Sequence, residues 1–411
     1  MKILTVISYF NNSYGGVQKT AQILANNFKD NNHESKVFIT EDKFKEKDLK
    51  NIKPFFQHIE LYFQDHQDII YKWSPDIIVF IDHAITYNNV KNLINLRSAW
   101  KLCFSIWGLP TKISESSDHL MLLSDWSHLL YKNKGGRNKK ISLIGIPFDL
   151  DEIKNVFKES IKNKYYKKSR CITLGRIGQP AEGSWSKYLI EIFEDLYELN
   201  SEIKLVLIGA PNSTIRRVKK SYLKSKIKIL EPNKDRKEIF KLHSSIDIFI
   251  HISSFGETFG KVILESLSTG AHAVVLNTPW ASIGHKFYKY QDSNLVHVNN
   301  LKNMKKALIK VINKLNSENQ KRNLKLEYIK PYSGENTVKE ILKNYRLRHK
   351  NIELQNTNRF KIIKSLDRSF DRLNLFSRIH IIIFGLSFRY LHRIYCGFRK
   401  IDINFKKNFS R

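Results

Sequence analysis

The chain of 411 residues is long enough for two domains of ordinary size, each with an ample hydrophobic core. Its three cysteines, Cys103, Cys171 and Cys396, match no zinc or redox spacing and suit a reducing compartment. No run reaches the ~18 apolar residues that span a bilayer. The short apolar run at residues 1–8 therefore predicts a first strand, and neither a membrane span nor a signal peptide.

The formal net charge is +31. A protein this basic is attracted to polyanions such as nucleic acid, an anionic membrane surface or lipid phosphates. A composition rich in lysine, asparagine and isoleucine accounts for part of the charge equally well. Because the charge is spread along the chain and no nucleic-acid recognition motif is present, nucleic acid is not an expected partner.

In the first half, short apolar runs alternate with helical or loop segments, and residues 17–28 have apolar side chains at a helical period. The second half begins with an apolar run at residues 171–178 that continues into a glycine loop. The strands expected elsewhere are residues 3–7, 36–39, 77–81, 101–106, 120–123, 141–144, 203–208, 226–230, 246–250 and 273–276. The further helices expected are residues 236–243, 262–267, 301–315 and 332–345.

Several polar or glycine-bearing loops follow these strands. Gly15 and Gly16 lie between a strand and a helix, where backbone N–H groups can bind an anion. His83 follows the 77–81 strand and is either a polar contact to a ligand or a solvated side chain. Trp107 follows the 101–106 strand. Its side chain either stacks on a sugar or belongs to the core. Arg176 lies in the segment that ends in Gly178, and its guanidinium suits paired bonds to phosphate oxygens.

The polar stretch that follows Asp149, up to residue 169, is interpreted as a linker between two halves of the chain. Asp149 and Asp151 form a two-carboxylate pattern of a kind that holds a metal ion in some enzymes. Carboxylates at a helix start also favour the helix dipole, and the capping interpretation is preferred here. No metal site is expected.

The most informative stretch is residues 253–265, which lies between an expected strand and an expected helix. Such a loop lies at the carboxyl edge of a parallel sheet, where open α/β sheets bind ligands. Gly256 and Gly260 permit tight turns, and the helix start near Phe259 suits a phosphate. Glu257 and Glu265 suit hydroxyl groups, so the stretch predicts a site for a sugar nucleotide. An ordinary capped helix with two solvated carboxylates is the alternative.

The segment from Glu257 to Glu265, with Lys261 and the following Ser-Leu-Ser-Thr-Gly, resembles the Glu-x7-Glu signature of retaining glycosyltransferases of family 4, which have the GT-B fold. That resemblance implies that Glu257 lies near the transferred sugar and that Glu265 holds the ribose of the nucleotide. It implies that Arg176 contacts the diphosphate and that Gly15 and Gly16 lie beside the donor phosphates.

The same resemblance extends to residues 1–348 and departs from the family pattern in two places. The family usually has a Lys shortly after the Gly-Arg segment, where this chain has Glu182 or Ser184, so Lys187 is the candidate substitute. Trp107 occupies the place where the family often has a His that touches the donor sugar. The candidate donor-binding residues are Gly15, Gly16, His83, Phe259, Gly260, Lys261 and Glu265, and the candidate catalytic residues are Glu257, Arg176 and Lys187.

The expected fold is therefore α/β of the GT-B type, with two Rossmann-like parallel-sheet domains that face each other across a cleft. Residues 1–150 form the acceptor-side domain, residues 169–330 the donor domain and residues 331–348 a helix that crosses back to the first domain. Residues 349–411 form a basic, aromatic and helical extension with 14 Lys and Arg against 4 Asp and Glu, a formal excess of +10. Mixed aromatic and basic residues suit an anionic membrane interface, and a hairpin packed on the protein or on a dimer partner is the alternative.

The expected function is a retaining, metal-independent hexosyltransferase that moves a hexose from a nucleotide diphosphate sugar to a glycan or lipid-linked acceptor. The expected setting is bacterial surface polysaccharide or lipopolysaccharide synthesis, in the cytoplasm and peripheral at the inner face of the membrane. The nucleotide sugar is a substrate, and no cofactor is expected. The alternative is a catalytically degenerate GT-B scaffold or a glycan-binding assembly protein. The sequence leaves the base, the sugar, the acceptor, the linkage and the oligomeric state open.

Overall fold

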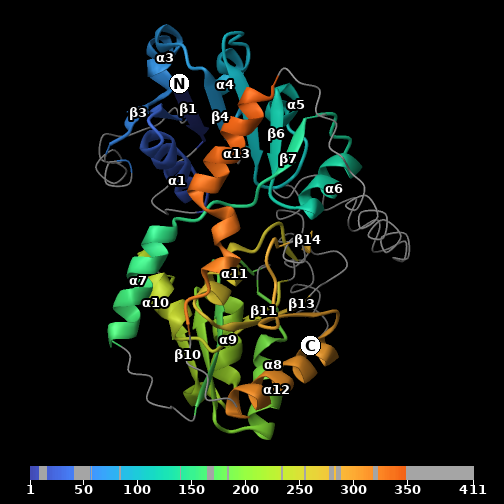
Figure 1. Ribbon diagram of the computed structural model, residues 1–411. Coiled ribbons are helices and arrows are strands. Elements are labelled where there is room, and N and C mark those ends of the chain that lie inside the picture. The colour runs from blue at the N-terminus through green and yellow to red at the C-terminus, as the bar shows by residue number, and fades with distance from the viewer. Residues whose placement is uncertain are drawn as a thin grey trace. The chain divides into compact units, whose positions relative to one another are not determined.

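The computed structural model describes residues 1–8, 16–40, 56, 58–82, 85–138, 140–163, 171–182, 185–232, 235–253, 256–276, 282–283, 288–317 and 323–348. Two open parallel sheets with flanking helices make up this part of the chain (Figure 1). Both sheets belong to one compact unit, Met1–Glu353. The basic extension predicted at residues 349–411 lies outside the described residues.

The first sheet has seven parallel strands in the order β3-β2-β1-β4-β5-β6-β7. Its strands are β1 Lys2–Ile7, β2 Glu34–Ile39, β3 Glu60–Tyr62, β4 Ile77–Asp82, β5 Trp100–Ser105, β6 His119–Leu122 and β7 Ile141–Leu143. Its helices are α1 Gly16–Asp30, α3 Gln67–Trp73, α4 Tyr87–Ile94, α5 Lys112–Ser116 and α6 Asp125–Asn133, with the 3-10 turn η2 Gln64–His66.

Both faces of this sheet are buried, because alternate side chains of each strand enter different hydrophobic clusters. One cluster joins strand residues such as Ile3 and Val37 to Leu24 and Phe28 of α1. The other joins the neighbouring Leu4 and Phe38 to Val90 and Leu93 of α4, with Ile113 of α5. This double burial explains why the strands are nearly continuous apolar runs in the sequence.

The second sheet has six parallel strands in the order β10-β9-β8-β11-β13-β15. They are β8 Ile172–Ile177, β9 Ile203–Ile208, β10 Ile227–Leu230, β11 Ile248–His251, β13 His272–Leu276 and β15 Leu295–Val298. A separate two-stranded pair consists of β12 Gly256–Glu257 and β14 Ser282–Ile283. The helices are α7 Leu150–Asn163, α8 Leu189–Leu199, α9 Asn212–Lys220, α10 Arg236–Ser244, α11 Lys261–Ser268 and α12 Leu301–Ser317, with the 3-10 turn η4 Lys224–Lys226.

The last helix, α13 Gly334–Arg346, packs on the first sheet's side of the unit. It follows the 3-10 turns η6 Leu326–Tyr328 and η7 Lys330–Tyr332. The amide of Phe148 donates to the carbonyl of Tyr332 at 2.8 Å, and the amide of Gly334 donates to Phe148 at 2.9 Å. A Cβ on Gly334 would lie 2.5 Å from Ile23 of α1, so close packing against α1 requires a glycine there. The chain therefore leaves and re-enters the first half at adjacent points.

A hydrophobic cluster joins the two halves of the unit. It contains core residues of the first sheet, Phe249 and Val275 of the second sheet, and the connecting residues Tyr328 and Tyr332. The opposite face of the second sheet has its own cluster with helices α8, α9 and α12. The two sheets therefore share one of their cores.

The polar linker predicted after Asp149 forms a helix, α7, over its first fourteen residues, Leu150–Asn163. Its Ile153, Val156 and Phe157 are buried, because apolar residues recur at helical spacing among the charged ones and face α10. Asp149 accepts a hydrogen bond from the amide of Glu152 at 3.0 Å, which is the capping role preferred from the sequence.

The strands expected from the sequence are all present, with their ends shifted by two residues or fewer. None of the helices in the described part of the chain is both long and apolar enough to cross a membrane. Within that same part, no group of three His, Cys, Asp or Glu side chains is placed to hold a metal ion.

Candidate functional site

The candidate residues gather where the strand order of each sheet reverses. In the first sheet this point lies between β1 and β4, and in the second it lies between β8 and β11. Gly16 follows β1, Arg176 belongs to β8, and Glu257 follows β11. Open parallel sheets bind ligands beyond the carboxyl ends of their strands at such points. Both sheets thus direct candidate residues to the position expected for a ligand.

Some of the predicted residues are only partly described. Gly15 and His83 lie outside the described residues. Glu257 is described through its backbone, which pairs with Ile283 in the parallel β12–β14 ladder. Gly16 begins α1, and a Cβ on it would meet nothing within 4 Å, so packing does not require a glycine at this helix start.

Glu265 lies in the middle of α11 and is 1% exposed. Its Oε2 lies 3.5 Å from Nε2 of His243, which is completely buried in the last turn of α10. The other ring nitrogen, Nδ1, is 2.6 Å from the hydroxyl of Ser266. The contact with Ser266 holds the His243 ring, whose Nε2 then faces the Glu265 carboxylate.

Arg176, near the end of β8, is 2% exposed. One guanidinium nitrogen, Nη1, donates to the carbonyl oxygen of Ile177 at 3.0 Å. The guanidinium carbon lies 5.4 Å from the centre of the Trp185 ring and 5.8 Å from that of Phe249. Contact with aromatic faces stabilises a cation that has been removed from bulk water.

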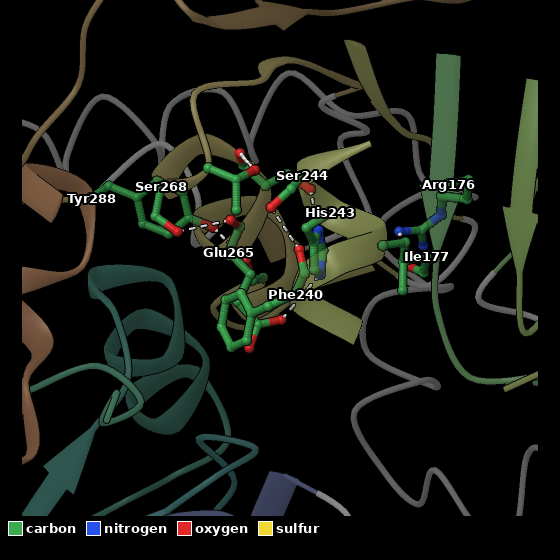
Figure 2. Close-up of polar contacts among 11 residues, drawn as sticks. Arg176, Ile177, Phe240, His243, Ser244, Glu265, Ser268 and Tyr288 are labelled. Atoms are coloured by element: carbon green, nitrogen blue, oxygen red, sulfur yellow. Dashed lines mark hydrogen bonds and ion pairs between the residues drawn. The ribbon is translucent and has the colours of Figure 1, made fainter. Parts of the chain in front are cut away.

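These residues form a contiguous series, which we call the Arg176–Glu265 row: Arg176, Phe249, His243 and Glu265. The ring centres of Phe249 and His243 are 6.1 Å apart, so Phe249 contacts both Arg176 and His243. Figure 2 shows His243 between Glu265 and Arg176. A cation at one end and a carboxylate at the other match the phosphate and hydroxyl groups of a nucleotide.

Phe259 anchors the loop that precedes α11. The ring is 2% exposed, and its centre lies 5.6 Å from that of Tyr288 and 5.0 Å from that of Tyr332, in edge-to-face geometry. Burial raises the pKa of the Tyr332 hydroxyl to about 12. The Tyr288 hydroxyl lies 2.6 Å from the carbonyl oxygen of Phe259 and 2.8 Å from that of Gly260. The side chain of Phe259 therefore belongs to the hydrophobic core. This holds independently of what its main-chain groups bind.

The same loop contacts the first half of the unit. The hydroxyl of Ser124, the N-cap of α6, donates to the carbonyl oxygen of Thr258 at 2.8 Å. The ammonium of Lys261 donates to the carbonyl oxygen of Pro147 at 3.3 Å and lies over the ring of Phe148. The loop is therefore held from both sheets.

Lys187 has a different setting. It lies in the turn before α8, is exposed, and its ammonium is 4.9 Å from the centre of the neighbouring Tyr188 ring. The structure thus places it outside the Arg176–Glu265 row. Its predicted role as the substitute lysine stays a prediction.

A buried carboxyl group lies at the carboxyl end of β4. Asp82 is 7% exposed, and its Oδ2 accepts a hydrogen bond from the hydroxyl of Thr111 at 2.6 Å. Burial raises the pKa of this carboxyl, although the bonds from Thr111 and Cys103 act in the opposite direction. Burial also raises the pKa of the Cys103 thiol. This network fixes the loop after β5 to the end of β4.

Sequence reasoning missed His243, Tyr288 and Ser124. His243 is the last residue of the predicted 236–243 helix, but a histidine at a helix end is common and its contact with Glu265 is tertiary. Ser124 had a local signal, because the serines at positions 124 and 127 bond reciprocally as a capping box. Tyr288 had no such signal.

Comparison with known proteins agrees with this fold. Residues 160–328 match the family model described as glycosyl transferases group 1. A structure of Alr3699/HepE from Anabaena in complex with UDP has a TM-score of 0.63 and 15% identity, and the match covers 84% of this chain and all of that one. The fold is GT-B. The GT-B prediction from the sequence is therefore confirmed.

Two further GT-B structures show the same arrangement. A structure of TarM from S. aureus with UDP has a TM-score of 0.62 at 11% identity, over 84% of this chain and 100% of that chain. The apo form of WaaB, a lipopolysaccharide outer core galactosyltransferase, has a TM-score of 0.59 at 14% identity, over 84% and 99%. A search of curated protein sequences finds no match. At such low identity these likenesses establish the fold and leave the roles of individual residues as predictions.

The N-cap of α11 provides a test of the loop. Gly260 has φ +79°, and a Cβ there would lie 2.8 Å from both Ile263 and the Tyr288 hydroxyl. Gly260→Ala should lower the free energy of unfolding by about 1–2 kcal/mol for the left-handed backbone, plus a further amount for this crowding. Gly135→Ala is the matched control, since Gly135 has φ +81° and nothing within 4 Å of a Cβ. Urea unfolding measures both, and an equal loss in the two variants would show that the loop is not tightly packed.

Proposed function

We propose that this protein is a nucleotide-sugar-dependent glycosyltransferase that transfers a hexose with retention to a glycan or lipid-linked acceptor. One observation carries the proposal. In a GT-B fold, Arg176 lies on β8 and the Glu257–Glu265 segment follows β11, and the order of the second sheet reverses between these two strands. This is where an α/β sheet binds a nucleotide.

The Arg176–Glu265 row suits the non-reacting parts of such a donor. The guanidinium of Arg176 is proposed to bind the diphosphate, and the Glu265 carboxylate to accept hydrogen bonds from the ribose. A carboxylate has two acceptor oxygens, so His243 can position Glu265 through Oε2 at 3.5 Å while the group also binds a hydroxyl. His243 is then a positioning residue.

The reaction breaks the bond between the sugar C1 and the diphosphate oxygen and forms a bond between C1 and an acceptor oxygen. Negative charge develops on the leaving diphosphate, and fixed donors lower the barrier by stabilising it. The proposed donors are Arg176, Lys261 or Lys187, the amides at Gly15 and Gly16, and those at the start of α11. The proton of the acceptor hydroxyl goes to the departing phosphate, and Glu257 lies beside the transferred sugar. No step in this proposal requires a metal ion.

A second candidate is a GT-B scaffold that binds a glycan or nucleotide without transfer. The observation in its favour is that Lys187 is exposed beside Tyr188 and lies outside the Arg176–Glu265 row. A scaffold would bind a sugar nucleotide and leave it intact. An assay of sugar transfer from a labelled nucleotide sugar separates the two candidates.

The test is transfer or hydrolysis of radiolabelled UDP-glucose, UDP-galactose, UDP-N-acetylglucosamine and GDP-mannose. UDP donors come first, because structures similar to this chain contain UDP or UDP-glucose. Arg176→Ala and Glu257→Gln should each lower the turnover rate by about 10²–10³. Arg217→Ala is the matched control, because Arg217 pairs with Glu191 on the surface at 3.8 Å. Full activity of the Arg176 and Glu257 variants would place the site elsewhere, and a bound but intact donor would favour the scaffold.

We also propose that residues 349–411 hold the enzyme at the inner face of the membrane, in the synthesis of bacterial surface polysaccharide or lipopolysaccharide. The formal excess of +10 in this stretch supports attraction to anionic lipid. The full chain should sediment with phosphatidylglycerol vesicles, and less of it should do so as salt is raised. Equal sedimentation with neutral phosphatidylcholine vesicles would show that charge does not cause the association.

A further inference from the structure

The charges of two neighbouring segments in the second half are separated by sign. Residues 212–230, which include α9, η4 and β10, contain seven Lys and Arg and no Asp or Glu. The adjacent helix α8 has the opposite composition, because it contains Glu191, Glu194, Asp195 and Glu198 and no Lys or Arg. A lysine-rich composition alone would not separate the charges in this way, so the separation calls for a physical reason.

The fold directs the cations of residues 212–230 to the surface. Val218, Leu223 and Ile227 are buried in the cluster that α9 shares with the second sheet. Six exposed cations of this segment form what we call the β10 edge patch: Arg216, Lys219, Lys220, Lys224, Lys226 and Lys228. The seventh cation, Arg217, lies 3.8 Å from Glu191. In the part of the chain that the structure describes, none of the six patch cations lies within 4 Å of a carboxylate oxygen.

Protection of a sheet edge explains only part of this patch. β10 is the outermost strand of the second sheet, and lysines on an edge strand prevent unwanted pairing with another chain. This accounts for Lys226 and Lys228. It does not account for Arg216 and Lys220, which lie one turn apart on α9, where like charges repel each other and destabilise the helix. An anionic partner would offset that repulsion.

The patch lies toward the amino edge of the second sheet, opposite the candidate site. The helix α9 connects the parallel strands β9 and β10, so it runs back from their carboxyl edge to their amino edge. Its last turn, η4 and the start of β10 therefore lie at the amino edge. Arg176 is near the carboxyl end of β8, and the Glu257–Glu265 segment follows the carboxyl end of β11. A large partner at the patch therefore leaves the candidate site open.

We propose that the β10 edge patch is an electrostatic docking surface for an anionic lipid membrane. Basic residues held near such a membrane are attracted to it, and the attraction adds up over a cluster. Stable attachment of a peripheral protein takes two separate signals, and the patch provides a second one beside residues 349–411. The four carboxylates of α8 restrict the contact to the β10 edge, because an anionic surface repels them. The inference does not depend on the transferase function.

The test measures sedimentation of the full chain with vesicles made of phosphatidylglycerol and phosphatidylcholine in equal parts. The patch variant carries four substitutions: Arg216→Gln, Lys219→Gln, Lys220→Gln and Lys224→Gln. It should lower the vesicle partition coefficient at least about tenfold, since each basic residue near an anionic surface contributes a factor of about five. A second variant combines Lys224→Gln, Lys226→Gln and Lys228→Gln. It should weaken binding as well, and it keeps the test decisive if the first variant does not fold.

A control with the same change in net charge makes the result specific. It alters α12, which packs on β13 and β15 near the opposite edge of the second sheet. Its four substitutions are Lys302→Gln, Lys306→Gln, Lys310→Gln and Lys314→Gln. This control should bind the vesicles nearly as well as the wild type. An equal loss in the control and in the patch variant would overturn the proposal, because net charge alone would then cause the binding.

A further variant separates the patch from the basic extension. It carries Arg389→Gln, Arg393→Gln, Arg399→Gln and Lys400→Gln. If this variant lost binding and the patch variant kept it, the extension alone would hold the protein, and the proposal would be overturned. Failure of the wild type to sediment with these vesicles also overturns it. So does a patch variant that binds vesicles normally but loses affinity for a duplex DNA probe, because the partner would then be nucleic acid.

Discussion

The burial of Phe259 among aromatic rings is the interaction on which the site depends. Tyr288 and Tyr332 enclose the ring, and a Cβ on Gly145 would lie 2.9 Å from it. With the ring fixed, hydroxyl groups of Ser124 and Tyr288 reach the carbonyl oxygens of Thr258, Phe259 and Gly260. Because a peptide group is planar, fixing a carbonyl also fixes the N–H of the next residue. The backbone donors at the start of α11 are thus oriented before any ligand arrives, which is the condition for strong electrostatic stabilisation.

The parallel order of the strands brings the other groups to this loop. The second sheet places β8 next to β11, so Arg176 lies near the segment that carries Glu257 although more than 80 residues separate them in the sequence. Phe249 and His243 then fill the space between Arg176 and Glu265. A buried cation and a buried carboxylate are both costly to desolvate, and each is stabilised here by aromatic or polar contacts.

Much of this arrangement follows from the sequence alone. Strands buried on both faces are continuous apolar runs, so their positions, and the helix from Lys261 to Ser268, are readable without a structure. The Glu-x7-Glu spacing and the Gly-Arg segment predicted that the candidate residues lie at the carboxyl edge of the second sheet, and the structure has Arg176 on β8 and Glu257 after β11. β3 was missed because three residues are too few to show a pattern. The sequence predicted a helix start near Asp149 but not the fourteen-residue length of α7, because charged residues surround its three buried apolar ones.

The contacts of the site were less predictable, for a physical reason. His243, Tyr288 and Ser124 act through tertiary contacts, and no local pattern marks which side chain a fold will bring to a given carboxylate or carbonyl. Trp107 illustrates the limit well. Its position after a strand was readable, but the sequence left a sugar-stacking and a core role open, and only the folded chain shows that 40% of its surface is exposed.

The central claim is that Glu265 belongs to a nucleotide site. Thermal unfolding of the wild type and of Glu265→Ala with UDP, GDP, dTDP and CMP tests it most directly, with each protein compared with its own ligand-free midpoint. A nucleotide at about a hundred times its dissociation constant adds about 2.7 kcal/mol to stability. We expect one nucleotide to raise the midpoint of the wild type and to leave that of Glu265→Ala nearly unchanged. Equal stabilisation of both proteins, or none of the wild type, would contradict the claim.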